Sequence, residues 1–210
     1  MEVGCLSAAN KPAFRDIETF AGPIYHTGEW PQDGVDFTGL RVGIIGTGSS
    51  AIQSIPLIAQ QAKTLTVFQR TPNYSVPAWN ATLTPEYRQQ VKATYPELRA
   101  KARARPTGFY FPFNAQPALD ATPEERTKRY EAAWQEGGLP FLGTYGDLLF
   151  EKKANDTIAE FARQKIRSIV KDPAVAELLC PDNVFGCKRD RKSTRLNSSH
   201  VSESRMPSSA

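Results

Sequence analysis

The sequence lacks several features that would assign it to a specialised class of protein. Its three cysteines are an odd number without the spacing of a disulfide framework, so we expect reduced thiols. No apolar run approaches the ~18 residues of a membrane span and no signal segment is visible, so we expect no membrane association and a cytoplasmic location. The net charge is only +4, without a basic stripe interleaved with aromatic residues, which argues against nucleic-acid binding. Nothing in the sequence indicates a metal site or a protein partner.

Residues 40–70 have the pattern of a strand, a glycine-rich turn, a helix and a second strand. Residues 40–45 (LRVGII) and 65–68 (LTVF) are short apolar runs, typical of strands buried in a parallel sheet. Apolar residues between them recur at helical spacing, although Pro56 should kink that helix or cost it a hydrogen bond. This order predicts a βαβ unit in an α/β fold, with an incomplete parallel sheet in which residues 40–45 form the central strand.

Residues 84–180 are predicted to be mostly helical, because helix start and stop signals divide them. The signals are Thr84-Pro85 at one start, a capping box of Thr122 and Glu125 at another with Gly137-Gly138 at its end, and Asp172-Pro173 after a helix over residues 151–171. The aromatic run over residues 109–113 (FYFPF) is interpreted as a core or interdomain contact in preference to a substrate wall.

The turn after the first strand has the sequence Gly46-x-Gly48-x-x-Ala51. Gly46 permits a tight turn, Gly48 lets a pyrophosphate approach the backbone, and Ala51 allows the helix to pack closely on the strand. The helix N-terminus adds N–H groups and positive potential. We therefore expect a dinucleotide here, with a purely structural glycine turn as the alternative. The expected cofactor-binding residues of this turn are Gly46, Thr47, Gly48, Ser49, Ser50, Ala51 and Gln53.

The residues after the second strand select the cofactor. An NAD site would place Asp or Glu there to accept a hydrogen bond from the ribose 2′-hydroxyl. This chain has Gln69-Arg70-Thr71 instead. Arg70 can pair with a 2′-phosphate and Thr71 can donate to the same group, so NADPH is favoured over NADH. The alternative is that Arg70 is a solvated surface residue.

A spaced motif, Phe20-x-Gly22-x-x-x-His26-x-x-x-Trp30-Pro31, precedes the βαβ unit. At every defined position it resembles the fingerprint of type I Baeyer–Villiger monooxygenases, flavin enzymes that convert ketones to esters or lactones. Related N-hydroxylating monooxygenases place another aromatic residue where Trp30 stands. In the family this motif lies in a linker between cofactor domains, so the resemblance implies an orienting or hinge role for His26 and not that of a general base.

Three further segments resemble this family, namely residues 3–7 (VGCLS), 68–72 (FQRTP) and 185–189 (FGCKR). The resemblance implies that Lys188 contacts the 2′-phosphate of NADPH. It also implies that Arg189 is the catalytic residue, whose fixed guanidinium stabilises developing negative charge. Without the resemblance the two residues would be interpreted as a solvated basic pair. The implied cofactors are NADPH and FAD, and the implied substrates are a small-molecule ketone and O₂.

The resemblance divides the chain into five parts. These are a flavin-domain remnant and linker (1–31), a Rossmann-type NADP-binding βαβ unit (32–83), a helical insertion (84–180), a return to the NADP domain (181–189) and a serine-rich tail (190–210) expected to be disordered and non-native. The glycine motif that binds FAD in the family is missing, so we expect an internal fragment that is inactive in isolation. Two alternatives stay open: a dinucleotide-binding module without catalysis, and an N-hydroxylating flavin monooxygenase.

Overall fold

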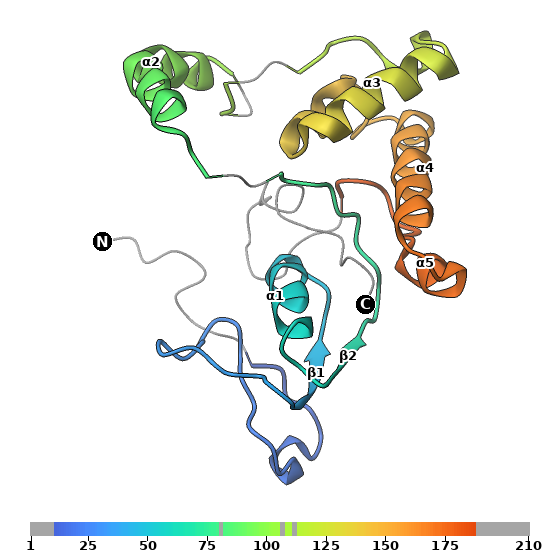
Figure 1. Ribbon diagram of the computed structural model, residues 1–210. Helices are drawn as coiled ribbons and strands as arrows, with labels where there is room; N and C mark the ends of the chain where they lie inside the picture. Colours follow the sequence, from blue (N-terminus) through green and yellow to red (C-terminus); the bar gives the residue numbers. More distant parts are fainter. Residues whose placement is uncertain (1–10, 80–81, 106–107, 111–112, 188–210) are drawn as a thin grey trace.

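The structure is a computed structural model and is shown in Figure 1. It describes residues 11–79, 82–105, 108–110 and 113–187. Several predictions fall outside these residues: those for the tail over 190–210, for the segment 3–7, and for Lys188 and Arg189.

The described residues form an α/β structure in which a strand–helix–strand unit is followed by a helical part, in the order that the sequence predicts. The elements are the 3₁₀ helix η1 (Ile17–Thr19), β1 (Arg41–Ile45), α1 (Ser49–Ala59), β2 (Thr64–Phe68), α2 (Pro85–Arg103), η2 (Ala118–Asp120), α3 (Pro123–Glu136), η3 (Leu139–Thr144), α4 (Lys152–Ile169) and α5 (Pro173–Leu179). No helix within the described ranges is both long enough and apolar enough to cross a bilayer.

The two strands pair in parallel, with Arg41 opposite Thr64 at one end and Ile45 opposite Phe68 at the other. Helix α1 connects them and lies beside both strands (Figure 1). The helix runs through Pro56 without ending there. The predicted βαβ order and parallel pairing are therefore confirmed.

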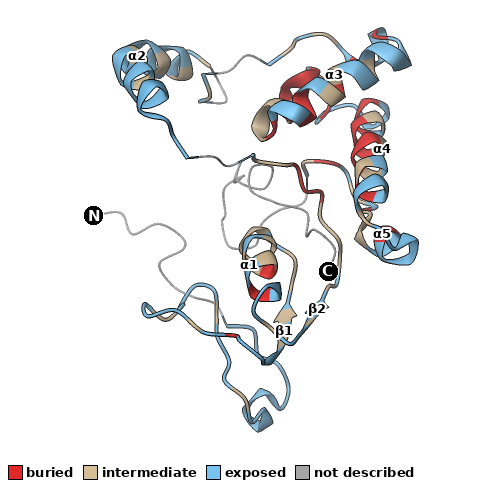
Figure 2. Cartoon of the chain, viewed as in Figure 1, coloured by how far each residue is buried: buried red, intermediate tan, exposed pale blue. Residues whose placement is uncertain are grey.

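The strands are less buried than their composition predicts. Ile45 is 66% exposed and Phe68 is 58% exposed, and no residue of either strand is buried (Figure 2). The cause is the size of the sheet, which has two strands in the described part of the chain, so that each strand is an edge. The prediction of a buried, central strand over residues 40–45 is wrong for these residues.

Hydrogen bonds at the helix ends follow the capping signals in the sequence. The Thr84 hydroxyl oxygen accepts from Tyr87 N at 3.2 Å at the start of α2. In α3 the Thr122 hydroxyl oxygen accepts from Glu125 N at 3.2 Å, while the Glu125 carboxylate accepts from Thr122 N at 2.8 Å. Gly137, with φ of 78°, follows the last residue of α3. These caps fix the boundaries because each one satisfies N–H or C=O groups that the helix itself leaves without a partner.

Asp172 begins a short additional helix inside the range 84–180 that the sequence predicts to be mostly helical. Its carboxylate accepts hydrogen bonds from Ala174 N and Val175 N, and it is the N-cap of α5. Asp172-Pro173 was interpreted only as a stop signal after α4, although a capping residue followed by proline is equally a start signal.

The main core is formed by buried residues of α3, η3 and α4 together with Tyr74, Val76 and Phe185. Figure 2 shows the buried positions on α3 and α4. The core is largely aromatic. The ring centroids of Tyr130 and Phe161 are 5.5 Å apart, and those of Trp134 and Phe141 are 5.6 Å apart. Burial raises the pKa of Tyr130 to about 12, as expected for a hydroxyl in an apolar surrounding.

The described residues of the aromatic run over 109–113 are not among the buried residues of this core. Tyr110 is 53% exposed and Phe113 is 37% exposed. Phe113 nevertheless lies against η3, because a Cβ added at the buried Gly143 would come within 3.2 Å of Phe113 Cδ1. The interpretation as a core or interdomain contact stays a prediction. The core takes Tyr130, Trp134, Phe141 and Phe161 from helices and Tyr74, Tyr145 and Phe185 from loops, so a local concentration of aromatic residues does not by itself predict core membership.

One buried amide joins the helical part to residues 181–187, which we call the return segment. Asn155 on α4 is 2% exposed. Its Nδ2 donates to Leu148 O at 2.8 Å and to Phe185 O at 2.9 Å, and its Oδ1 accepts from Phe185 N at 2.8 Å. Phe185 is thereby held against the rings of Tyr74 and Phe141, at centroid distances of 4.7 and 5.6 Å.

We expect Asn155→Ala to lower the free energy of unfolding by about 3–5 kcal/mol, because three hydrogen bonds are lost and their backbone partners stay buried without one. Urea unfolding of the purified chain measures this. Gln164→Ala is the matched control, since the amide of Gln164 is exposed and bonds only to Glu160. A loss below about 1 kcal/mol in Asn155→Ala would show that the amide is not a principal contact.

Candidate functional site

The turn between β1 and α1 leaves its backbone accessible. Gly46 has φ of 101°, a conformation that favours glycine, and its N–H donates to Phe68 O at 2.9 Å. Gly48 is the N-cap of α1 and has no side chain with which to cap it. An added Cβ at either glycine would meet nothing within 4 Å. A ligand can therefore approach the backbone at both positions.

The first turn of α1 is otherwise regular. Gly48 O accepts from Ile52 N at 3.0 Å. The Gln53 amide donates to Ser49 O at 3.2 Å, and the Ser54 hydroxyl donates to Ser50 O at 2.5 Å. In both of these bonds the side chain donates to a backbone carbonyl, and neither bond involves a backbone N–H group of the first turn. Thr47 and Ala51, the remaining residues predicted for this turn, are both partly buried.

The glycine turn and the residues after β2 lie at the same edge of the sheet. The parallel register places Ile45 opposite Phe68, so that both strands end together (Figure 1). Arg70 follows β2 and is exposed, and Thr71 is partly buried. The structure thus brings together, at the carboxyl ends of the strands, the two groups of residues that the sequence predicts for a cofactor, and this edge is where parallel sheets bind ligands.

The residues after β2, which we call the strand-end loop (residues 69–76), are held by the end of the helical part. The Gln69 amide donates to Leu178 O at 2.8 Å, at the end of α5. The Asn183 amide donates to Pro72 O at 3.5 Å. These contacts join segments that are more than 100 residues apart in the sequence.

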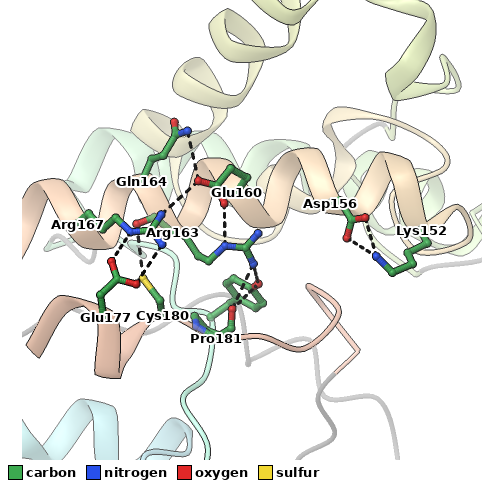
Figure 3. A network of polar contacts seen from close by, with 10 residues as sticks. Lys152, Asp156, Glu160, Arg163, Gln164, Arg167, Glu177, Cys180 and Pro181 are labelled. Atoms are coloured by element: carbon green, nitrogen blue, oxygen red, sulfur yellow. Dashed lines mark hydrogen bonds and ion pairs between the residues drawn. The ribbon is translucent and has the colours of Figure 1, made fainter. Parts of the chain in front are cut away.

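Tyr74 and Arg163 make a further connection between the strand-end loop and the return segment. The Arg163 guanidinium donates to the Tyr74 hydroxyl at 2.7 Å and to Pro181 O at 3.2 Å (Figure 3). The Tyr74 hydroxyl donates in turn to Pro181 O at 3.1 Å. Burial raises the pKa of Tyr74, although the charge of Arg163 opposes the shift, so the hydroxyl keeps its proton for this bond.

Gln69, Tyr74 and Arg163 were not among the predicted site residues. The bonds that Gln69 and Tyr74 make to Leu178, Arg163 and Pro181 span 89 to 109 residues, and no local pattern predicts such pairs. The only signal was the resemblance of residues 68–72 and 185–189 to one family. In the structure Asn183 bonds to Pro72 O, and the ring of Phe185 lies 4.7 Å from that of Tyr74. Cys180 and Cys187 carry free thiols. The two basic residues that follow Cys187 lie outside the described residues.

The five fingerprint residues lie apart from the glycine turn. Phe20 is 62% exposed, and its ring covers Gly22, where an added Cβ would come within 2.8 Å of Phe20 Cε1. His26 accepts a hydrogen bond at Nδ1 from Gly28 N, 3.1 Å away, within a local turn. Phe20 and His26 therefore make local structural contacts within the described residues.

Trp30 belongs to a small aromatic cluster that connects the linker to the strand–helix–strand unit. Its ring centroid lies 5.9 Å from that of Tyr25 and 6.0 Å from that of Phe37. Phe37 is buried, and its N–H donates to the Gln61 side chain at 3.1 Å, just after α1. Pro31 O accepts from Gly34 N at 3.1 Å and turns the chain between the two aromatic residues. This cluster fixes the linker against α1.

The edge of the sheet offers chemistry suited to a phosphate group. The start of α1 supplies backbone N–H groups and positive potential. Arg70 supplies a guanidinium with several fixed donors. Among the residues that the structure describes, no group of three or more His, Cys, Asp or Glu side chains is placed to hold a metal ion.

Known proteins were compared with this chain in sequence and in structure. No family model matches the sequence. A Baeyer–Villiger monooxygenase from Pseudooceanicola batsensis is 45% identical over 185 residues, which are 87% of this chain and 34% of that protein. The chain therefore spans about a third of the length of the curated relatives it matches.

Two solved structures share the fold. An oxidised steroid monooxygenase bound to NADP is 51% identical, with a TM-score of 0.83, over 89% of this chain and 36% of that chain. The protein OTEMO in complex with FAD and NADP is 37% identical, with a TM-score of 0.85, over 94% of this chain and 38% of that chain. The predicted resemblance to Baeyer–Villiger monooxygenases is confirmed over this part of their length.

One relative has a different activity in its name. A phenazine N-monooxygenase from Lysobacter antibioticus is 37% identical over 87% of this chain and 34% of that protein. The similarity alone therefore extends to enzymes that oxidise nitrogen as well as to those that oxidise ketones.

The two glycines of the turn should respond differently to alanine. We expect Gly46→Ala to lower the free energy of unfolding by about 1–3 kcal/mol, because its φ of 101° is strained for a residue with a Cβ. Gly48→Ala should change it by no more than about 0.5 kcal/mol, since φ is −76° and the surrounding space is open. Urea unfolding of the two variants side by side tests this, and equal losses would contradict the described turn.

Proposed function

We propose that this chain is the NADPH-binding part of an FAD-dependent monooxygenase that converts ketones to esters or lactones with O₂. The observation that carries the proposal is the open glycine turn beside Arg70, at the carboxyl edge of a parallel sheet, in a chain similar to proteins of this activity. On this proposal residues 32–83 belong to a Rossmann-type NADP domain and residues 84–180 are a helical insertion. Residues 1–31 belong to the flavin domain and linker, and residues 181–189 return to the NADP domain.

The residues present fit a dinucleotide. The pyrophosphate would lie over Gly46 and Gly48, where a Cβ would otherwise project into the open space, and would receive hydrogen bonds from the start of α1. Arg70 would pair with the 2′-phosphate of NADPH, with Thr71 and Lys188 beside it. The remaining residues assigned to the nucleotide are Thr47, Ser49, Ser50, Ala51 and Gln53.

The single glycine turn of this sequence is assigned to NADPH, so the residues present do not supply an FAD pyrophosphate site. FAD, when bound, supplies the oxygen chemistry of such an enzyme. This chain would contribute Arg189, whose guanidinium would stabilise negative charge developing next to the ketone. Phe20, Gly22, His26, Trp30 and Pro31 would orient the linker between the two cofactor domains, as the local contacts of His26 and Trp30 favour.

N-hydroxylation is the second candidate, supported by the similarity to a phenazine N-monooxygenase. Trp30-Pro31 favours the oxidation of ketones, because N-hydroxylating enzymes have another aromatic residue at the position of Trp30. The isolated chain has a single dinucleotide turn, so by itself it would be a binding module without catalysis. We expect the small-molecule partners to be a ketone and O₂.

Arg70→Ala tests the nucleotide assignment. We expect the unmodified chain to bind NADPH more tightly than NADH, and the variant to lose about 1.5–3 kcal/mol of binding to NADPH alone, because only NADPH carries the 2′-phosphate. Calorimetric titration with both nucleotides at one salt concentration measures this. Arg88→Ala, an exposed arginine on α2, is the control and should bind as the unmodified chain does. Equal affinity of the unmodified chain for the two nucleotides would overturn the assignment.

A chimaera tests the activity. Residues 11–189 would replace the matching third of the Pseudooceanicola batsensis monooxygenase. We expect this protein to convert a cyclic ketone to a lactone with NADPH and O₂, and Arg189→Ala to lower that rate by about 100-fold or more while NADPH still binds. Arg88→Ala again serves as the control. Lactone formation that survives Arg189→Ala would remove the catalytic assignment, and oxidation of an amine in place of the ketone would favour the second candidate.

A further inference from the structure

We propose that Gln69 and Tyr74 are positioning residues for nucleotide selectivity, which hold the strand-end loop against the helical part so that Arg70 is placed for a 2′-phosphate. The inference rests on the proposed function, in which Arg70 binds that phosphate. The inference goes beyond the proposed function because it assigns the preference for NADPH in part to residues that do not touch the nucleotide. The interaction between the strand-end loop and residues 178–183 is its basis.

Arg70 lies between two points at which the strand-end loop is held. Gln69, the residue before it, donates to Leu178 O at 2.8 Å. Pro72, two residues after it, accepts from Asn183 Nδ2 at 3.5 Å. The loop has left β2 at this point and has no strand beside it within the described residues, so side-chain contacts such as these and those of Tyr74 hold it.

The groups that hold the loop are themselves well fixed. Leu178 O belongs to the last turn of α5, where carbonyl groups have no partner within the helix and accept readily from side chains. Arg167 on α4 bonds to both carboxylate oxygens of Glu177 on α5, at 2.6 and 3.2 Å (Figure 3). The Leu178 carbonyl is therefore attached to α4, the most buried helix of the core.

Tyr74 completes this attachment from the other end of the loop. It is 7% exposed, and its hydroxyl both accepts from Arg163 at 2.7 Å and donates to Pro181 O at 3.1 Å. Arg163 is fixed in turn by Glu160, whose carboxylate accepts from Arg163 Nε at 2.9 Å (Figure 3). The strand-end loop is therefore connected through two separate side chains to α4.

These contacts should act on selectivity and not on nucleotide binding as a whole. The glycine turn is held by β1 and α1, and its Gly46 N–H bonds to Phe68 O before the loop begins. Loosening the loop leaves that turn in place, so contacts common to NADPH and NADH persist. Arg70 is exposed and has a flexible side chain, so its pairing with a phosphate depends on a fixed backbone. Only NADPH carries the 2′-phosphate whose pairing with Arg70 depends on the fixed backbone.

Gln69→Met and Tyr74→Phe test the proposal in the full 210-residue chain. Each removes hydrogen-bonding atoms and keeps most of the side-chain volume. Dissociation constants for NADPH and NADH are measured by calorimetric titration, together with the unfolding temperature. We expect the ratio of the NADH constant to the NADPH constant to fall by about 3- to 10-fold in both variants. The NADH constant itself should change by less than about twofold.

Two control variants lose comparable groups elsewhere. Gln135→Met removes an exposed amide on α3 that bonds to Glu131 and does not reach the loop. Tyr130→Phe removes a buried hydroxyl that bonds to Thr157 within the core, so it should lower the unfolding temperature. Both controls should keep the nucleotide ratio of the unmodified chain. A loss of stability is thereby separated from a loss of selectivity.

The outcomes separate this proposal from the one on which it rests. If the unmodified chain shows no preference, or Arg70→Ala leaves it unchanged, the proposed function fails and this inference fails with it. If Arg70→Ala abolishes the preference while Gln69→Met and Tyr74→Phe retain it, only the positioning role is overturned. An equal loss for both nucleotides in these two variants also overturns it. Should Tyr74→Phe fail to fold, Gln69→Met, at the molecular surface, decides alone.

Discussion

The buried amide of Asn155 is the contact on which the path of the described chain depends. More than one hundred residues separate the end of β2 from the return segment, and the helical part between them could end in many places. Two hydrogen bonds of Asn155 hold the backbone N–H and C=O of Phe185 at α4 in one position and one direction, and a third ties the same amide to Leu148 O. Phe185 then fills the space between Tyr74 and Phe141. The proximity of the return segment to the strand-end loop is a consequence of this arrangement.

The two parts of the molecule differ in how they are stabilised. The helical part has a continuous aromatic core, whereas the strand–helix–strand unit has few buried residues, among them Ile55, Ile58 and Phe37. Segments with little buried surface open more readily than the core. The residues proposed to bind the nucleotide thus lie on the less stable part and depend on the more stable part through side chains such as Gln69 and Tyr74.

Local chemistry made much of the fold predictable from the sequence. The glycine turn, the capping box at Thr122 and the helix start at Thr84 are each determined by residues within a few positions of one another. The parallel pairing follows from the order of strand, helix and strand over about 30 residues. Contacts between distant segments were not predictable, because no periodicity relates Gln69 to Leu178 or Asn155 to Phe185. The burial of a strand depends on what covers it, which its own composition does not determine.

The candidate site was predictable to the same extent. The order of Gly46, Gly48 and Arg70 along one βαβ unit was sufficient to place them at one edge of the sheet, because parallel strands end on the same side. The sequence motif that contains His26 and Trp30 was informative about family but not about geometry, since its residues lie in local turns and a small aromatic cluster.

The two-stranded sheet also has a consequence for the behaviour of the chain in solution. Each strand has one edge without a neighbouring strand in the described residues, and the side chains of Ile45 and Phe68 are exposed there. An uncovered β-edge presents backbone N–H and C=O groups in the spacing that another strand requires, which makes it a template for further pairing. Within the described residues, the tendency of this sheet to pair with further strands therefore depends on what lies against its two edges.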